Sequence, residues 1–211
     1  MLKDHTQSFL DLAVRYEALR FGEFTLKSGR VSPYFFNAGV FADGEGIDGL
    51  ARCYAQALID SNMAFDQLFG PAYKGIPLVA VIALTLWRDF GINVPYVYNR
   101  KEAKDHGEGG FLVGPPLQGR VVIVDDVISA GTSVAESMQW IESANATPSG
   151  VLIALDRQEQ GVGSVSAVQA VEAQGLQVAS IAKLADLIAW LKKQGHKHLG
   201  AMEAYQATYG A

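Results

Sequence analysis

Two adjacent carboxylates, Asp125 and Asp126, follow the apolar run 121–124 and precede a turn of small and hydroxyl-bearing residues at 129–133. The β-branched residues of the run suit a buried parallel strand, and open α/β sheets bind ligands at the carboxyl ends of such strands. Backbone N–H groups of the turn and the dipole of the next helix can bind a phosphate, and the carboxylates can accept hydrogen bonds from vicinal hydroxyls. The pattern predicts a site for a ribose 5-phosphate; the alternative is that the carboxylates cap a helix beside an ordinary turn.

A second turn, FGPAYKG at 69–75, follows a predicted strand and opens a predicted helix. Its backbone amides and the Lys74 ammonium can meet a second phosphate group. The signal is modest, because strand–glycine–helix turns occur throughout α/β folds and a solvated lysine beside a capped helix would look the same.

A third segment, 100–108, holds Arg100, Lys101, Lys104 and His106 among acidic residues, and its permanent charges, three positive and three negative, sum to zero. A mobile arm of this kind can direct several cations toward one pyrophosphate while its acids face water. A solvated charged loop is the alternative. Glycines, prolines and the lack of a periodic apolar face predict a long loop over 100–119.

The rest of the chain alternates between helical and strand patterns. A helix at 5–20 and two short strands at 21–26 and 31–37 precede the main fold. From residue 44 onward we predict helices at 46–62, 75–90, 132–145 and 164–174, strands at 66–70, 94–99, 120–125, 149–155 and 177–181, and closing helices at 183–194 and 198–208. This alternation indicates an α/β fold, with a mostly parallel twisted sheet flanked by helices.

Composition narrows the class of function. With 211 residues, 49% of them hydrophobic, the chain can bury a full core in one domain. The net charge of −5 argues against nucleic acid as a partner. No apolar run reaches the roughly 18 residues that a membrane span needs, so no membrane partner is expected. The single cysteine, Cys53, favours a reducing compartment, and without a signal-peptide pattern we expect a cytoplasmic protein.

Residues 121–133, VVIVDDVISAGTS, closely resemble the phosphoribosyl pyrophosphate (PRPP) motif of the type I phosphoribosyltransferases. Four further segments narrow the resemblance to the bacterial orotate phosphoribosyltransferases: FTLKSGRVSPYFFNAG at 24–39, FGPAYKGIP at 69–77, RKEAKDHGEGG at 100–110 and LDRQE at 155–159. The resemblance covers nearly the whole chain. Its one mild departure is Ser129, where the family would have threonine, and the hydroxyl is kept. It implies a single domain over 1–211, with a small N-terminal hood at about 1–40 and a flexible lid loop at about 100–112.

The resemblance also implies roles for particular residues. Lys104, Asp125 and Asp126 would be catalytic, and the Ala72–Tyr73 peptide would be cis. The implied PRPP contacts are Lys27, Tyr73, Lys74, Arg100, Lys101, Lys104, His106, Asp125, Asp126, Val127, Ile128, Ser129, Ala130, Gly131, Thr132 and Ser133. The implied orotate contacts are Phe35, Phe36, Ser129 and Arg157. From the residues alone, Arg157 could instead form a surface ion pair with Glu159, and the two phenylalanines could face the core.

The implied reaction transfers the phosphoribosyl group from PRPP to orotate and gives orotidine 5′-monophosphate and pyrophosphate, a step of pyrimidine biosynthesis. Mg²⁺ is the expected cofactor, held mainly through PRPP rather than by direct protein ligands. The family also implies a homodimer with shared active sites. Two alternatives stay open. A purine-base phosphoribosyltransferase would need a different hood and base pocket, and a non-catalytic PRPP-sensing regulator would lack the lid and carry a DNA-binding appendage.

Overall fold

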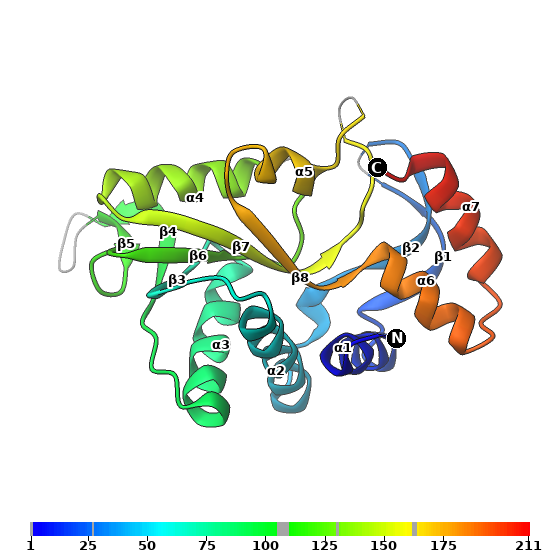
Figure 1. Ribbon diagram of the computed structural model, residues 1–211, viewed down its shortest axis with the longest axis horizontal. Coiled ribbons are helices and arrows are strands. Elements are labelled where there is room, and N and C mark those ends of the chain that lie inside the picture. The colour runs from blue at the N-terminus through cyan, green and yellow to red at the C-terminus, as the bar shows by residue number, and fades with distance from the viewer. Residues whose placement is uncertain (1, 27, 105–109, 130, 162–163) are drawn as a thin grey trace.

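The computed structural model describes residues 2–26, 28–104, 110–129, 131–161 and 164–211 (Figure 1). Its centre is a six-stranded sheet in the order β5–β4–β3–β6–β7–β8, in which neighbouring strands are parallel except for β4 and β5. The strands are β3 (Gln67–Gly70), β4 (Tyr96–Lys104), β5 (Gly110–Val113), β6 (Arg120–Val124), β7 (Thr147–Asp156) and β8 (Gln177–Lys183). The predicted mostly parallel α/β fold is confirmed.

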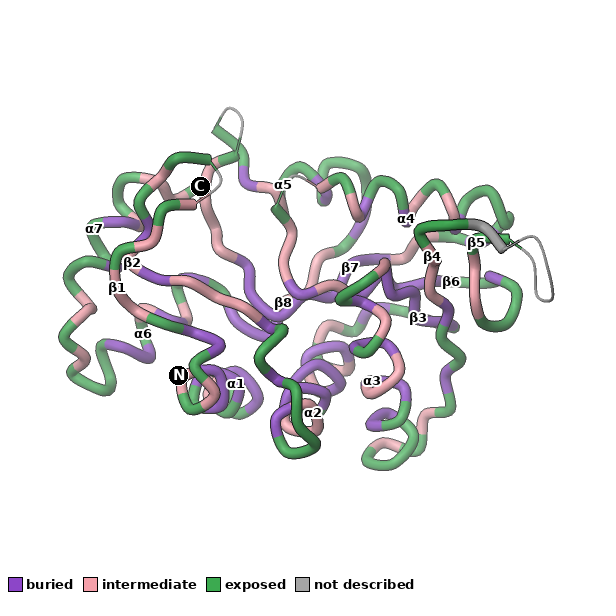
Figure 2. The backbone as a smooth tube through the Cα atoms, turned by 180° about the vertical axis from the view of Figure 1, so that it is seen from behind, coloured by how far each residue is buried: buried purple, intermediate pink, exposed green. Residues whose placement is uncertain are grey.

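Helices cover both faces of this sheet, which Figures 1 and 2 show from opposite sides. One face carries α1 (Asp4–Arg15), α2 (Gly44–Asp60) and α3 (Gly75–Phe90), and the other carries α4 (Thr132–Ser143) and α5 (Ala167–Glu172). None of the helices in the described parts of the chain has the length and hydrophobicity of a membrane span.

The apolar run of β6 supplies both hydrophobic cores. Val122 and Val124 belong to the core that α1, α2 and α3 cover, whereas Val121 and Ile123 belong to the core beneath α4 and α5. All four side chains are fully buried, because successive residues of a strand point to opposite faces and both faces are covered. Apolar and polar residues therefore do not alternate along this strand. Because β6 is an inner strand, its carboxyl end lies near the middle of the sheet.

A separate hairpin, β1 (Leu19–Thr25) and β2 (Val31–Phe36), lies beside α6 (Leu184–Lys193) and α7 (Leu199–Tyr209), beyond the β8 edge of the main sheet (Figure 1). The short 3-10 helix η1 (Ala38–Val40) follows β2. Tyr34 of β2 is fully buried and packs edge-on against Tyr205 of α7, with ring centroids 6.2 Å apart. The beginning of the chain and its last helix therefore build one unit.

The structure corrects two predictions of secondary structure. The loop predicted over 100–119 contains the end of β4 and all of β5, which pair antiparallel at the edge of the sheet. Exposed edge strands tolerate polar residues, so their sequence carries no apolar alternation to detect. The helix predicted over 5–20 ends at Arg15, because the backbone bends at Glu17 (φ 55°) before β1 begins.

Candidate active site

The two carboxylates predicted to bind a sugar lie at the carboxyl end of β6 and are held by different groups. Asp125 Oδ1 accepts a hydrogen bond from the backbone N–H of Asp126 at 2.8 Å, and its Oδ2 accepts one from the Ser133 hydroxyl at 3.1 Å. The Tyr54 hydroxyl donates to the Asp125 carbonyl at 2.8 Å. Asp126 is only 5% exposed, and its Oδ1 accepts from the Val127 N–H at 3.0 Å. Both carboxylates are thus fixed in direction by the protein.

The environment of Asp125 disfavours its charge. Burial raises the pKa of the Asp125 carboxyl to about 6; the backbone hydrogen bond from Asp126 opposes this shift, and the charge of Asp126 adds to it. Perturbed carboxyls in a cleft are typical of functional sites. Asp125 is therefore the described carboxylate of this site whose charge responds to pH just below neutrality.

The turn after these carboxylates lines a cleft of about 390 Å³. Gly131 precedes α4 with φ 75°, a left-handed conformation that glycine adopts without strain. The first residues of α4 also line the cleft, so the positive end of the helix dipole opens toward it. Of the predicted phosphate-binding residues, the cleft gathers Val127, Ile128, Ser129, Gly131, Thr132 and Ser133. Ala130 lies outside the described residues.

The opposite wall of the cleft is the turn between β3 and α3. The Ala72–Tyr73 peptide is cis, as predicted. A side chain at Gly70 would collide with the backbone carbonyl of Gly75, so the turn can only be this tight with glycine there. Tyr73 and Lys74 are both exposed at the mouth of the cleft.

An ion pair joins the two walls. Lys74 Nζ lies 2.5 Å from Asp126 Oδ2, with the lysine side chain 56% exposed and the carboxylate 7% exposed. The sequence places these residues far apart, and the neighbouring positions of β3 and β6 in the sheet bring them together.

The strand β4 carries the predicted cations to the same region. Lys101 Nζ lies 4.7 Å from the centroid of the Tyr73 ring, a cation–π contact, and Arg100 is half-buried next to it. Lys104 ends β4, but its side chain lies outside the described part of the structure, as do Lys27 and His106. Their predicted contacts with PRPP stay predictions.

Arg157 follows β7, and its guanidinium is held on three sides. Its Nη2 and Nε lie 2.7 Å and 2.9 Å from Glu159 Oε1, its Nη2 donates to Ser32 Oγ at 3.2 Å, and its Cζ lies 4.2 Å from the Tyr34 ring centroid. The ion pair with Glu159 is therefore present, but it is half-buried, with side chains 20% and 12% exposed. Among the described residues, these hydrogen bonds use Nε and Nη2 of the guanidinium, and none of them uses Nη1.

Phe35 and Phe36 lie on opposite faces of β2. The Phe36 ring packs edge-on against Phe9 of α1 at 5.9 Å, whereas the Phe35 ring lies 5.6 Å from Phe24, with the Arg20 guanidinium over both rings of that pair. Side chains alternate along a strand, so the two rings cannot both face one planar ligand. A base contact that involves both residues would have to use the backbone of at least one of them.

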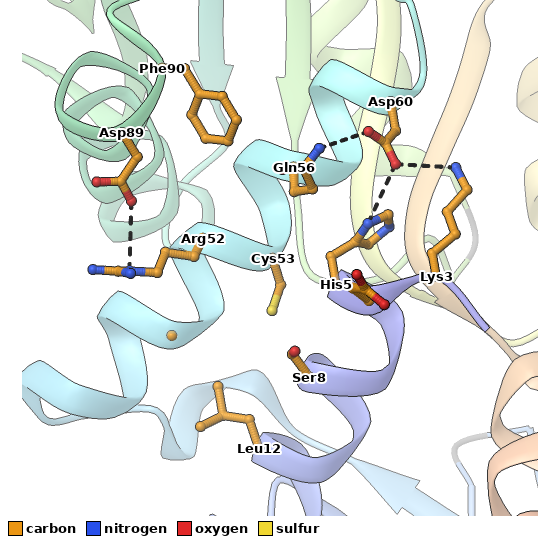
Figure 3. Close-up of a pocket in the computed structure, with 12 residues that line it drawn as sticks. Lys3, His5, Ser8, Leu12, Arg52, Cys53, Gln56, Asp60, Asp89 and Phe90 are labelled. Carbon is orange, nitrogen blue, oxygen red and sulfur yellow. Dashed lines mark hydrogen bonds and ion pairs between the residues drawn. The ribbon is translucent and has the colours of Figure 1, made fainter.

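A larger cavity of about 680 Å³ lies between α1, α2 and the end of α3, and none of the described residues predicted for the site lines it (Figure 3). Its charged groups pair with one another: His5 Nδ1 lies 3.6 Å from Asp60, and Arg52 Nε lies 3.6 Å from Asp89. Burial raises the pKa of the Cys53 thiol to about 12, so it stays protonated and unreactive. The smaller cleft, which is lined by Lys74, Asp125 and Asp126, is therefore the candidate active site.

Sequence reasoning missed several residues that build the site. Tyr54 lies on the buried face of α2, where nothing in the sequence distinguishes it from other core residues. Ser32 and Tyr34 share the buried face of β2, and their alternation in the predicted strand was the available signal.

Comparison with known proteins agrees with this geometry. The family model of the phosphoribosyl transferase domain matches residues 42–168, a range that includes both walls of the cleft. The fold and the cleft thus define the class of protein, a phosphoribosyltransferase.

Individual relatives narrow the class. The chain is 58% identical over 212 residues to an orotate phosphoribosyltransferase of Thioalkalivibrio sulfidiphilus, covering 99% of this chain and 100% of that one. It is 56% identical to the orotate phosphoribosyltransferase of Cronobacter sakazakii over the same shares of the two chains. The crystal structure of the Francisella tularensis orotate phosphoribosyltransferase superposes with a TM-score of 0.88 at 39% identity, covering 96% of this chain and 99% of that one. The chain belongs to the orotate phosphoribosyltransferase family.

Proposed function

We propose that this chain transfers the phosphoribosyl group of PRPP to orotate, giving orotidine 5′-monophosphate and pyrophosphate in pyrimidine biosynthesis. One observation carries the proposal. The Lys74 turn and the Asp125–Asp126 pair face each other across one cleft and meet in a 2.5 Å ion pair, so groups suited to pyrophosphate and to ribose hydroxyls lie within one contact of each other. Full-length similarity to orotate phosphoribosyltransferases supports the choice of orotate as the base.

In this reaction a ring nitrogen of orotate attacks the anomeric carbon of PRPP, the carbon–oxygen bond to pyrophosphate breaks, and the electron pair leaves with pyrophosphate. No protein nucleophile is needed. Positive charge develops on the ribose and negative charge on the leaving group, so catalysis depends on positioned charges of the opposite sign. Asp125 and Asp126 would hold the ribose hydroxyls, and cations of the Lys74 turn and of β4 would meet the pyrophosphate.

Lys74 would change partners when PRPP binds. Its present partner, Asp126, is the more buried of the two and is anchored by a backbone N–H, so the lysine is the group free to move. Release of Asp126 would expose an acceptor to the ribose at the moment that Lys74 turns to the phosphates. Lys104, at the end of β4, is the cation that we propose acts on the leaving group, and closure of the β4–β5 arm as a lid would exclude water.

Mg²⁺ belongs to the proposal, because hard divalent ions prefer oxygen ligands and PRPP is rich in anionic oxygens. Among the described residues, no cluster of three or more potential protein ligands gathers, so PRPP would supply most of the ligands. The oxygens of Asp125 and Asp126 are the protein donors nearest to the proposed ribose. When bound, the ion would neutralise charge on the departing pyrophosphate.

We also propose a cytoplasmic homodimer with shared active sites. Leu84 and Trp87 are 58% and 59% exposed and lie one turn apart on α3, a surface that a second copy could cover. The single cysteine suits a reducing compartment. Mixing an Asp125→Ala/Asp126→Ala variant with a Lys104→Ala variant should restore part of the activity, since each mixed dimer would contain one intact site. Mixed dimers without activity would contradict the shared site.

An absorbance assay with orotate, PRPP and Mg²⁺ tests the reaction directly. Orotate loss should match pyrophosphate release, and hypoxanthine and uracil should give no turnover. Turnover with hypoxanthine instead would identify a purine enzyme. Tight PRPP binding without turnover of any base would favour a non-catalytic PRPP-sensing regulator.

A further inference from the structure

The segment 209–211 lies beside the loop that follows β7, next to Arg157. The backbone N–H of Gln160 donates to the Tyr209 carbonyl at 2.9 Å, and that of Ala211 donates to the Gln158 carbonyl at 3.0 Å. Figures 1 and 2 both show the C-terminal end of the chain against this loop. Residues 158–160 and 209–211 thus pair like two short antiparallel strands.

The loop is bent at Gln158, which separates Arg157 from Glu159. Gln158 has φ 49°, a left-handed conformation that is unfavourable for a residue other than glycine. Its backbone N–H donates to Asp156 Oδ1 at 2.9 Å, and its side-chain Oε1 accepts from the Ala185 N–H at 2.9 Å. The Gln158 carbonyl, its third polar group, accepts the hydrogen bond from the Ala211 N–H. An unfavourable conformation that is held from several sides is a mark of functional sites.

The bend turns Glu159 back onto the arginine. The Glu159 carboxylate binds Nε and Nη2 of Arg157 and also accepts from the Tyr34 hydroxyl at 3.3 Å. On its other side, the Arg30 guanidinium donates to the Gln160 carbonyl at 2.6 Å and lies 5.2 Å from the centroid of the Tyr209 ring. The hairpin and the segment 209–211 therefore fix the backbone on which Glu159 stands.

We propose that Glu159 is a positioning residue for Arg157, and that the segment 209–211 is a clamp that holds Glu159 in place. With Nε and Nη2 engaged, the guanidinium can present only Nη1 to the base site, in one direction. This restraint would lower the entropy that is lost when an anionic base binds. The inference rests on the proposed function and on the orotate contact that the family resemblance implies for Arg157.

Two variants and a matched control test the clamp. Gly210→Ala should displace the segment, because a Cβ at Gly210 would lie 2.5 Å from the Gln206 carbonyl oxygen. Gly200→Ala, in the helix α7 that Gly210 follows, meets nothing within 4 Å and serves as the control. Glu159→Gln keeps the shape of the side chain and removes its charge.

Gly210→Ala and Glu159→Gln should each raise the KM for orotate by about tenfold, as expected when one charge-assisted hydrogen bond is misaligned. The KM for PRPP and kcat should stay within about twofold of the original values. Modification of Arg157 by phenylglyoxal, followed by peptide mass spectrometry, should become several times faster in both variants. Gly200→Ala should behave like the original chain in every measurement.

Opposite results would overturn the inference. If Glu159 only neutralised Arg157, Glu159→Gln would leave a more cationic pocket and lower the KM for anionic orotate. Equal modification rates in Gly210→Ala and Gly200→Ala would remove the clamp. Should the original chain fail to turn over orotate, the proposed function falls, while the modification rates still decide whether Glu159 and the segment 209–211 position Arg157.

Discussion

The proposed phosphate side and the proposed base side of the site are built in different ways. The phosphate side comes from two short turns, at 71–74 and 125–133, each of which directly follows a buried strand. The base side brings together Ser32 and Tyr34 of β2, Arg157 and Glu159 after β7, and the segment 209–211. The geometry of each turn depends mainly on residues that are close in sequence. An assembled wall depends on packing between distant elements, so substitutions on the two sides should change different kinetic constants.

The largest effect is expected on the phosphate side. Lys104→Ala should lower kcat by about 10²- to 10³-fold, the loss typical of removing one group that stabilises transition-state charge. Thermal unfolding should be unchanged, because Lys104 ends β4 where it pairs with the edge strand β5, beyond the part of β4 that pairs with β3. Lys192→Ala, on α6 away from the cleft, is the matched control and should keep full activity. A near-normal kcat for Lys104→Ala would remove this residue from the mechanism.

A smaller and different effect is expected on the base side. Arg157→Lys should raise the KM for orotate by roughly 10- to 100-fold, because lysine cannot reproduce the planar fork that meets Glu159 and a ligand together. The KM for PRPP should change little, and steady-state kinetics with each substrate varied in turn measures both constants. Equal losses for the two substrates would show that the base wall also supports the phosphate side, and the contrast between the sides would fail.

The same contrast explains what the sequence could predict. The turn at 125–133 was predictable from neighbouring residues and a strand end, whereas the cis peptide at Ala72–Tyr73 was expected only from the family resemblance. The Lys74–Asp126 contact was not predicted, because it depends on the order of strands in the sheet. The pairing of 158–160 with 209–211 uses backbone atoms, which carry no sequence signal. The paired part of 100–113 was missed because its sequence carries no apolar alternation.

The pH dependence of activity should also reflect the phosphate side, through Asp125. Since burial raises the pKa of Asp125 to about 6, its carboxylate is lost as pH falls through that value, and a protonated carboxyl is a poorer acceptor for ribose hydroxyls. The kcat/KM for PRPP should therefore fall about tenfold per pH unit below this point. Asp125→Asn should lower activity and flatten this step. If the step persists in Asp125→Asn, ionisation of the PRPP phosphates is its cause.

The smallest effect concerns stability rather than rate. Asp125 has a higher pKa in the folded chain than in the unfolded chain, so its charge destabilises the fold above about pH 6, and this cost disappears below the unfolded value of about 4. Asp125→Asn should accordingly stabilise the chain at pH 8 by on the order of 2 kcal/mol, with no gain at pH 4, in urea unfolding experiments.

Asp66 provides a control, because its pKa is shifted in the opposite direction to that of Asp125. Its carboxylate accepts hydrogen bonds from the Arg120 side chain at 2.8 Å and 2.9 Å and from the Arg120 backbone, and these bonds lower the pKa of Asp66. Its stabilisation is therefore present above the unfolded pKa and is lost as pH falls below it. Asp66→Asn should destabilise the chain at pH 8, whereas Asp125→Asn should stabilise it. If both substitutions destabilise the chain, hydrogen bonds compensate the buried charge of Asp125. The ionised carboxylate then does not lower the free energy of unfolding.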